Sequence, residues 1–171
     1  MTEKHGQTGG FTFIELTVVI LLIGLLMGIT MPRFRYALLT DQLKGSTRKF
    51  IGMIKTLRSE AIRDQENYTL HFDLETDRYW IESETMTEEK RALVKQEART
   101  LPSGVQVQDV WYRDKGKKMT GETHVRFSKK GYVQPAVIHM GSDDDRAFTL
   151  VISPFLGRVK VLEGYVEFEN I

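Results

Sequence analysis

One charged residue interrupts a long apolar run near the start of the sequence, and it is the first candidate for chemistry. Glu15 is the only charge in the run FTFIELTVVILLIGLLMGITM, residues 11–31. A charged side chain in an apolar membrane setting costs about 2.5–3.5 kcal/mol unless it lies near the interface or is paired. Two interpretations of Glu15 are therefore open. It reaches headgroups or water near the end of the run, or it pairs with a cation.

A second acidic pattern has the spacing of a calcium-binding loop. Positions 1, 3, 5 and 12 of such a loop supply hard oxygen ligands, and they correspond here to Asp73, Glu75, Asp77 and Glu84. The sixth position needs glycine for a sharp turn, and in this sequence it is Arg78. We favour the alternative that these residues form a polar turn between two strands.

The other polar residues show no recognised catalytic or metal-binding spacing. His71 and His139 are expected at ordinary strand positions, and His5 and His124 also lack a partner at a known spacing. Residues 143–145, three aspartates, are interpreted as a solvated turn beside Arg146. The sequence contains no cysteine and shows no nucleophile elbow, phosphate loop or zinc motif. We expect no catalytic residue, no metal, no cofactor and no enzymatic activity.

Composition bounds the size of the protein and its partners. The chain has 171 residues, 41% of them hydrophobic and 27% charged, which suits one modest domain with an accessory segment. Its 24 Lys and Arg nearly balance 23 Asp and Glu, giving a net charge of +1. No overall field therefore recruits nucleic acid or an acidic surface, and partners must be argued from local features.

The apolar run predicts a retained transmembrane helix. A helix over residues 11–31 would rise about 31 Å at about 1.5 Å per residue, close to the ~30 Å bilayer core. A secretory signal peptide usually has a shorter apolar region of about 7–15 residues, followed by a small-residue cleavage site. This run instead ends in Met31-Pro32-Arg33. Pro32 predicts a kink or local melting of the helix, because proline lacks an N–H and its ring clashes with the preceding turn.

Residues 9–24, GGFTFIELTVVILLIG, resemble the leader-peptidase site and N-terminal helix of type IV pilins and type II secretion pseudopilins. The resemblance implies that a membrane-embedded prepilin peptidase cuts after Gly10 and methylates the new N-terminal residue, Phe11. It places Glu15 at the family's assembly glutamate, the fifth residue of the processed chain, and Pro32 at a proline common in the family.

Physical chemistry explains why these residues belong together. Cutting after Gly10 creates a cationic amine, and a carboxylate such as Glu15 is strongly stabilised beside it in a low dielectric. An amine from a neighbouring subunit would also fix the axial register of an assembly. The chain departs from the family at Phe13 and Thr17, and it lacks the usual Lys or Arg before the glycine. We therefore expect the prepilin peptidase to cleave this chain more slowly than a typical family member.

Beyond Pro32 the pattern remains helical and then changes to strands. Apolar positions recur at steps of 4, 3, 4, 3 and 4 along one face, at Leu43, Thr47, Phe50, Ile54, Leu57 and Ala61. One helix is therefore expected from about residue 11 to 63, with its second half packed on a globular domain. Alternation then predicts strands at residues 68–72, 79–81, 105–112, 124–127, 137–139, 148–152 and 158–162, with a short final strand at 165–168. Residues 86–99 are rich in charge and in helix formers, so they could be a short surface helix or a mobile loop between strands, and a loop with helical tendency is favoured.

The expected fold is α+β, in which a long N-terminal helix precedes an antiparallel β-sheet domain of pilin-like type. Its segments are a leader (1–10), a transmembrane helix (11–31), an amphipathic continuation of that helix (32–64) and a periplasmic β domain (65–171). Three later stretches, LRSEAIRDQENYTLHFD, VRFSKKGYV and FTLVISPFLGRVKV, are similar to the H-type minor pseudopilins. This resemblance implies a minor or tip subunit.

We therefore expect a minor pseudopilin of a type II secretion system, at or near the tip of the pseudopilus. The resemblance implies a single-pass protein of the bacterial inner membrane, with a cytoplasmic leader and a periplasmic C-terminal domain. The orientation rests on this resemblance, because Lys4 precedes the apolar run while Arg33 and Arg35 follow it. Its expected partners are the prepilin peptidase, other pseudopilins or pilins, the inner-membrane secretion machinery and membrane lipid.

Two other functions compete with this one. A minor pilin of a type IV pilus, serving assembly or DNA uptake, has the same N-terminal features. Nucleic acid is not favoured as a partner, because residues 163–171 carry three glutamates and no Lys or Arg, although Lys115, Lys117 and Lys118 form a small basic loop. A membrane-tethered sensor or binding domain is less favoured, because it leaves Glu15 and the Gly10-Phe11 junction unexplained.

Overall fold

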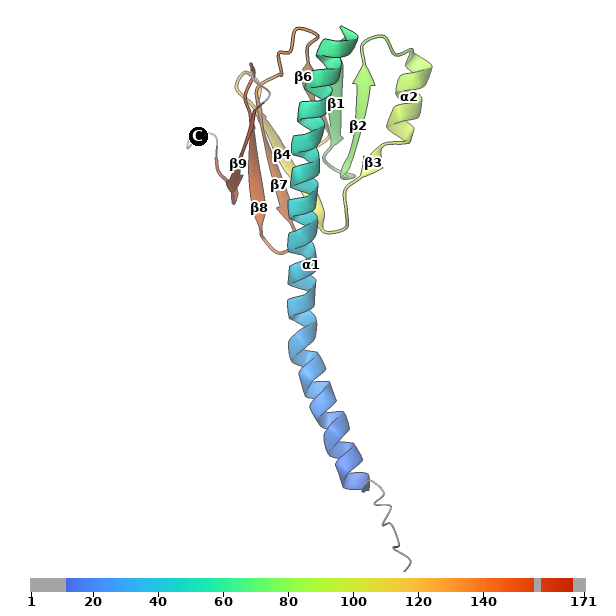
Figure 1. Cartoon of the computed structure of the whole chain (residues 1–171), viewed down its shortest axis with the longest axis vertical. Coiled ribbons are helices and arrows are strands. Elements are labelled where there is room, and N and C mark those ends of the chain that lie inside the picture. Colours follow the sequence, from blue (N-terminus) through green and yellow to red (C-terminus); the bar gives the residue numbers. More distant parts are fainter. Residues whose placement is uncertain (1–11, 156–157, 168–171) are drawn as a thin grey trace, which may run out of the picture. The chain divides into compact units, whose positions relative to one another are not determined.

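The computed structural model describes residues 12–155 and 158–167, and for residues 28–41 it describes the backbone alone. The chain separates into two units, Met1–Ala37 and Leu38–Ile171, and each is described by itself. Helix α1, Phe13–Asp64, supplies the described secondary structure of the first unit and continues into the second. The second unit, called the head below, combines the last part of α1 with strands and a short helix (Figure 1).

The strands of the head form two antiparallel sheets. Sheet A has the strand order β3-β2-β1-β6, and sheet B has the order β5-β4-β7-β8-β9. The elements are β1 (Tyr68–Asp73), β2 (Arg78–Ser83), α2 (Glu88–Gln96), β3 (Arg99–Thr100), β4 (Val105–Tyr112), β5 (Gly116–Lys118), β6 (Glu122–Phe127), β7 (Ala136–Ser142), β8 (Ala147–Ile152) and β9 (Val159–Glu163). The α+β class and the predicted internal strands are confirmed.

The apolar stripe of α1 joins the two sheets into one core. Phe50 contacts the rings of Phe72 in β1 and Tyr79 in β2, with centroids 5.6 and 5.0 Å away. On the side of sheet B, the Thr47 hydroxyl donates to Met140 Sδ at 3.8 Å. All six predicted stripe positions are buried, which confirms the helical periodicity: Leu43, Thr47, Phe50, Ile54, Leu57 and Ala61.

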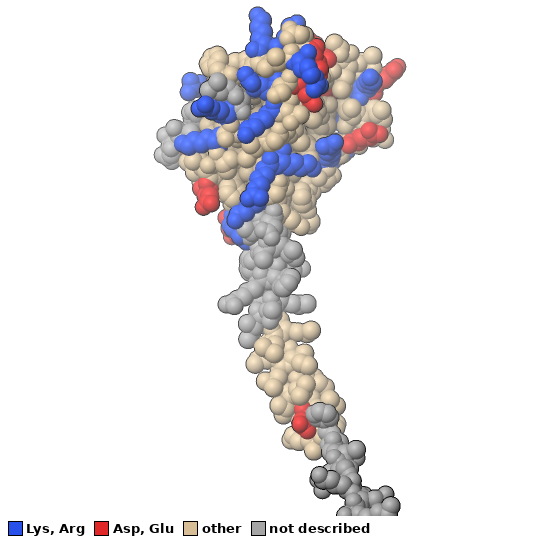
Figure 2. All heavy atoms as spheres, viewed as in Figure 1, with Lys and Arg blue, Asp and Glu red and all other residues tan. Residues whose placement is uncertain are grey.

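The opposite face of α1 in the head is polar and largely basic. Lys44, Arg48 and Lys55 are exposed there, and Figure 2 shows Lys and Arg side chains gathered over this part of the head. Charged residues on the face away from the core are the ordinary signature of an amphipathic helix. The second half of α1 therefore belongs to the head.

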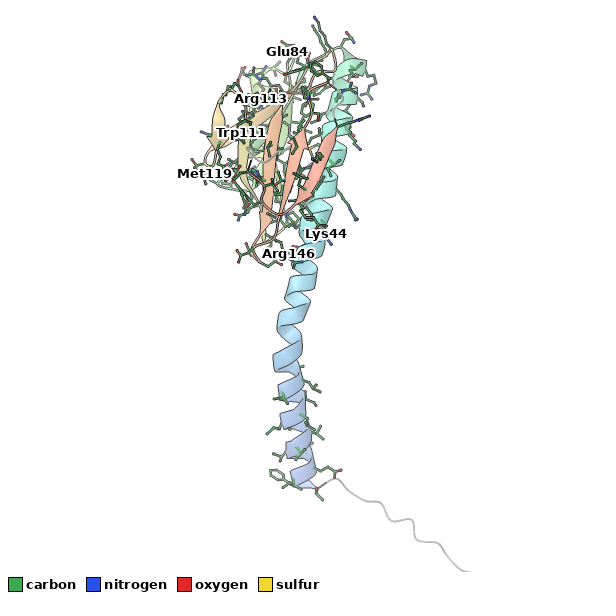
Figure 3. The ribbon with its side chains drawn as sticks, turned by 90° about the vertical axis from the view of Figure 1, so that its left-hand side faces the viewer. Lys44, Glu84, Trp111, Arg113, Met119 and Arg146 are labelled. Carbon is green, nitrogen blue, oxygen red and sulfur yellow. The ribbon has the colours of Figure 1, made fainter. Side chains whose placement is uncertain are left out.

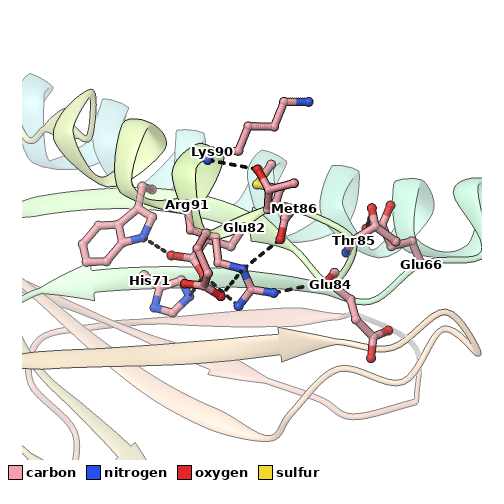
Figure 4. Close-up of polar contacts among 11 residues, drawn as sticks. Glu66, His71, Glu82, Glu84, Thr85, Met86, Lys90 and Arg91 are labelled. Atoms are coloured by element: carbon pink, nitrogen blue, oxygen red, sulfur yellow. Dashed lines mark hydrogen bonds and ion pairs between the residues drawn. The ribbon is translucent and has the colours of Figure 1, made fainter.

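The segment at residues 86–99 contains helix α2, so the alternative of a short surface helix is confirmed and the favoured loop was wrong. Thr87 caps the helix by accepting a hydrogen bond from the Lys90 backbone N–H at 3.3 Å, and two glutamates follow in the first turn. The Arg91 side chain then donates to the carbonyls of Met86 and Glu84 (Figure 4). No residue of α2 is buried, so the segment lacks the apolar stripe that would have predicted a helix.

The final strand predicted at residues 165–168 is also wrong over its described part. Gly164 adopts a positive φ of 85°, a conformation that glycine reaches without strain, and turns the chain away from β9. The Val166 N–H then donates to the side-chain hydroxyl of Thr149 in β8 at 2.9 Å, not to a backbone carbonyl of a strand. Residues 165–167 therefore lie on sheet B without joining it. Residue 168 lies outside the described residues.

The acidic turn between β1 and β2 is built by its own hydrogen bonds. The Asp73 carboxylate accepts from the backbone N–H groups of Glu75 and Thr76 and from the Thr76 hydroxyl. These bonds lower the pKa of Asp73, the hydroxyl contributing most. The turn therefore has the geometry of the polar hairpin that the sequence favoured.

Asp77, at the end of the same turn, behaves in the opposite way. Burial is the main cause of its raised pKa, although its carboxylate accepts from the Val107 backbone N–H. Among the described residues, its Oδ1 is a buried oxygen without a hydrogen-bond partner. Asp77 also has a positive φ of 53°, which asparagine tolerates well.

We expect Asp77→Asn to stabilise the head at neutral pH. A raised folded-state pKa means that Asp77 contributes stability below its unfolded pKa, near 4, and that this contribution is lost as pH rises through the folded pKa. Asparagine keeps an acceptor for Val107 and removes the buried charge. Denaturant unfolding across about pH 3–8 should show that Asp77→Asn has a higher free energy of unfolding than the wild type. This gain should become smaller in acid, where the Asp77 carboxyl is protonated in the folded head. A loss of stability in Asp77→Asn at about pH 7 would contradict this account. Asp73, whose pKa is lowered, provides the control, and Asp73→Asn should destabilise the head at neutral pH.

Candidate assembly site

Glu15 lies in the first turn of α1, which begins with a hydrogen-bonded cap. The Glu15 backbone N–H donates to Thr12 Oγ1 at 3.3 Å, and the Leu16 N–H donates to the Thr12 carbonyl at 3.2 Å. Thr17 donates its hydroxyl to the Phe13 carbonyl at 2.8 Å, so the helix satisfies this polar group itself. Within the described residues, the Glu15 carboxylate has neither an ion pair nor a hydrogen bond.

The side chains around Glu15 are apolar on every face of the helix and exposed. Their exposed fractions run from 44% at Val19 to 87% at Phe13. A helix that is apolar all round is normally buried, in a large core or in a membrane. This segment therefore needs a cover of lipid or of neighbouring apolar helices. The exposed side chains are Phe13, Ile14, Leu16, Val18, Val19, Ile20, Leu21, Leu22, Ile23, Leu25, Leu26 and Met27.

In the part of the chain that the structure describes, no helix combines the length and the hydropathy that a bilayer crossing requires. The span predicted at residues 11–31 includes positions outside the described residues or known there by backbone alone. Gly10 and Phe11, the predicted cleavage and methylation site, also lie outside the described residues. Pro32 falls within the helical backbone of α1, and the kink predicted there stays a prediction.

The head contains a buried polar cluster that sequence spacing did not reveal. His139 in β7 and Asp109 in β4 are register partners, both nearly inaccessible, with His139 Nδ1 2.6 Å from Asp109 Oδ1. The other ring nitrogen lies 2.9 Å from the Val166 carbonyl oxygen. Tyr165 donates its hydroxyl to Asp109 Oδ2 at 2.7 Å and stacks on the His139 ring. His139 lies in a strand, as expected, but it also has a specific buried partner in Asp109.

This cluster fastens residues 164–167, called the strap below, across sheet B. Thr149 in β8 donates to the Gly164 carbonyl at 2.8 Å, and Lys117 in β5 lies 3.2 Å from the Glu167 carboxylate. The Lys117 ammonium also sits 5.0 Å from the centroid of the Tyr165 ring. Hydrogen bonds with Tyr165 and then Glu167 raise the pKa of Lys117. The strap thus carries contacts to β8, β7, β4 and β5.

A second cluster covers sheet A beneath α2. His71 stacks on Trp80 with a centroid distance of 5.0 Å, lies 3.4 Å from the Glu82 carboxylate and contacts the ring of His124 (Figure 4 shows His71 and Glu82). Burial lowers the pKa of both histidines, and for His71 the charge of Glu82 opposes that effect. Lys95 of α2 lies over Trp80 and pairs with Glu122 of β6. The cluster attaches α2 to the sheet.

No family model matches the chain. The chain is 27% identical over 143 residues to type II secretion system protein H of Pseudomonas aeruginosa, covering 82% of this chain and 80% of the relative. The chain is therefore similar to a type II secretion system protein H over most of its length. The resemblance seen in the sequence is thereby confirmed.

A solved minor pseudopilin shares the fold of this chain. The crystal structure of the minor pseudopilin EpsH from the type II secretion system of Vibrio cholerae aligns with a TM-score of 0.53 at 16% identity, covering 74% of this chain and 98% of that one. A second EpsH structure aligns with a TM-score of 0.49 at 18% identity, covering 72% and 98%. The alignment with a TM-score of 0.53 shows that the two chains share a fold.

Proposed function

We propose that this protein is a minor pseudopilin of a type II secretion system, a processed filament subunit at or near the tip of the pseudopilus. The observation that carries the proposal is an exposed helix, apolar on all sides, with one carboxylate in its first turn. Such a helix needs apolar neighbours, and its carboxylate needs a cation among them. The relationship to protein H of Pseudomonas aeruginosa supports the choice of secretion system.

The cation comes from processing. Cleavage after Gly10 frees the amine of Phe11, which becomes N-methylated and stays positively charged. Glu15 pairs with such an amine on a neighbouring subunit, and the apolar side chains of both helices exclude water from the pair. A pair inside a low dielectric holds the two helices at one axial offset, so Glu15 sets the register of the subunit.

Anchoring and partners follow from the same segment. Residues 11–31 hold the subunit in the bacterial inner membrane before assembly, with the leader in the cytoplasm and the head in the periplasm. The prepilin peptidase, the membrane lipid, the inner-membrane secretion machinery and other pseudopilins are then its partners. The head supplies contacts to neighbouring subunits and acts without catalysis, metal or cofactor.

A minor pilin of a type IV pilus is the alternative, because its subunits would need the same processed helix. The similar proteins favour secretion, because the Pseudomonas aeruginosa relative and the Vibrio cholerae structure are both named as type II secretion proteins. A membrane-tethered sensor is less favoured, because a helix that serves only as a membrane anchor does not require the Glu15 carboxylate.

We expect Gly10 to be required for both processing and secretion. In cells with an active prepilin peptidase, mass spectrometry should find a chain that begins with N-methylated Phe11. Gly10→Leu should leave residues 1–10 attached, because the peptidase needs a small residue there, and export of type II cargo should fall to the level of a deletion strain. Gly10→Ala is the milder matched change.

Two results would contradict the proposal. An intact leader on the wild-type chain would remove the processing step. Normal cargo export by Gly10→Leu, combined with loss of type IV pili in the same strain, would assign the subunit to the pilus instead.

A further inference from the structure

Sheet B ends in an open edge at β9. The strand order β5-β4-β7-β8-β9 places β9 at the margin of the sheet, and within the described residues no strand lies beyond it (Figure 1). The strap leads away from this edge, because it crosses the sheet to Lys117 in β5 at the opposite margin. One side of the β9 backbone therefore has no neighbouring strand in the described part of the head.

Hydrogen bonds at the two ends of β9 show which of its backbone groups face the open side. The Ser153 N–H donates to the Arg158 carbonyl at 2.9 Å, and the Gly164 N–H donates to the Ala147 carbonyl at 2.8 Å. In an antiparallel pair, residues that bond the partner strand alternate with residues whose backbone groups point away from it. The even-numbered residues of β9 therefore bond β8. The residues whose N–H and C=O groups point away from the sheet are Val159, Val161 and Glu163.

The other strands at the sheet margins are short or already covered. Strands β3 and β5 have two and three residues. On β6, the Tyr112 hydroxyl donates to the His124 carbonyl at 2.7 Å and accepts from the His124 N–H at 3.2 Å. Gln134 likewise donates to the Arg126 carbonyl at 2.8 Å and accepts from its N–H at 3.3 Å. Among the described strands, β9 is therefore the longest edge without a cover, with five residues.

The core-facing row of sheet B reaches this edge while it is still apolar. Val110, Ile138, Leu150 and Val161 are register partners across β4, β7, β8 and β9. The first three side chains are at most 1% exposed, whereas Val161 is 38% exposed. A further apolar side chain beyond Val161 would continue the row and remove it from water.

The core-facing side of the edge also has room for such side chains. A hollow of about 310 Å³ lies between α1 and the end of β9, and its lining includes Lys44, Phe148 and Glu163. Figure 3 shows Lys44 at the same end of the head as Arg146, which also lines the hollow. Glu163 shares the face of Val161, because side chains two apart on a strand point to the same side. The hollow therefore lies on the side where the apolar row ends.

The opposite face of the same edge is cationic. Lys160 points to the other side of the sheet from Val161, and Arg158, two residues before it, lies on the same face as Lys160. Both cations are exposed, and within the described residues neither side chain makes an ion pair or a hydrogen bond. A carboxylate placed against this face would complement their charge.

We propose that an extended segment of a neighbouring pilin-like subunit adds to β9 as a sixth strand of sheet B, an inference that rests on the proposed function. Main-chain hydrogen bonds to the outward groups of β9 supply affinity, and alternate side chains supply specificity. An apolar side chain of the segment continues the row that ends at Val161. An acidic side chain on the other face pairs with Lys160. The segment therefore alternates apolar and acidic residues.

Substitutions at residue 161 test the backbone pairing. The Val161 N–H points away from β8, so Val161→Pro removes an outward donor without removing a hydrogen bond of sheet B. Val161→Ala is the matched control, because it shortens the side chain and keeps the donor. The full processed chain is purified in mild detergent together with the other pilin-like subunits of one strain, and the recovery of those subunits is measured. Recovery with Val161→Pro should be about tenfold lower than with Val161→Ala, the effect of about one lost hydrogen bond.

A charge reversal tests the cationic face in the same purification. Lys160→Glu should lower the recovery of the other subunits, because it places like charges against each other. Lys129→Glu is the matched control, since Lys129 is exposed in the segment after β6 and lies outside sheet B. It should leave the recovery unchanged.

Hydrogen exchange reads the same edge without any substitution. In the chain alone, the amide of Val161 should exchange faster than the amides of Lys160 and Leu162, because only the latter two bond β8. In the complex with the other subunits, exchange at Val161 should slow to the rate of its neighbours. This measurement decides the question if Val161→Pro unfolds the head.

Three results would overturn this inference alone. They are equal recovery with Val161→Pro and Val161→Ala at the same unfolding midpoint, an effect of Lys160→Glu no larger than that of Lys129→Glu, and unchanged exchange of the Val161 amide in the complex. Protection of Val161 that grows with the concentration of the chain alone would also overturn it, since the occupant would then be a second copy. A wild-type chain that recovers no pilin-like subunit would overturn the proposed function as well.

Discussion

Replacing His139 by alanine is expected to lower the free energy of unfolding of the head by about 3–5 kcal/mol, the cost of removing one partner from a buried pair. Of its partners among the described residues, the Asp109 carboxylate would keep the Tyr165 hydroxyl and would lose the His139 ring at 2.6 Å, in a site closed to water. The Val166 carbonyl would lose its contact at the same time. Because typical stabilities are only about 5–15 kcal/mol, such a loss should be plain in denaturant unfolding.

His71 provides the matched control for this experiment. It is also a strand histidine facing a carboxylate, but its side chain is 19% exposed and the distance to Glu82 is 3.4 Å. Pairs that water can reach contribute about 0.2–1 kcal/mol, so His71→Ala should cost much less. Unfolding of the full chain in detergent, followed by tryptophan fluorescence, would compare the two. Equal costs for His71→Ala and His139→Ala would show that the Asp109–His139 pair is not the anchor of the strap.

The periodic parts of this fold were predictable because each depends on local pattern. The stripe along α1 follows from spacing alone, since residues three and four apart share a face. The β4 strand, Val105–Tyr112, follows from alternation and was predicted with its observed bounds. Helix α2 was missed because it buries no residue, although Thr87 followed by two glutamates was a readable capping signal.

The Asp109–His139 pair could not be predicted, because its members are 30 residues apart and meet only when β4 and β7 pair. Spacing rules for catalytic or metal-binding histidines address local motifs, and this pair is set by sheet register. The strap was missed for a related reason. Residues 165–167 look like a strand, yet side chains from three other strands take up their hydrogen-bonding groups. The roles of Gly10, Phe11 and Glu15 depend on partners, and they stay predictions.

Glu15→Leu is also expected to have a large effect. It should reduce incorporation of the subunit into the filament and leave the folding of the head unchanged. In a filament, the substitution leaves a neighbouring subunit's amine unpaired in low dielectric, so incorporation should fall while processing after Gly10 continues. In a simple tether, the same substitution removes an insertion cost of about 2.5–3.5 kcal/mol, so the protein should insert at least as well. Thr17→Leu is the matched control, because it removes a nearby polar group whose hydrogen bond stays within the helix.

The most direct test measures cleavage, crosslinking to other pilin-like subunits and export of type II cargo in one strain that carries Glu15→Leu. The account predicts normal cleavage, a loss of crosslinks and a loss of export, with Thr17→Leu close to wild type in all three. Normal crosslinking together with normal export in the Glu15→Leu strain would contradict the central claim that this carboxylate assembles the subunit into a filament.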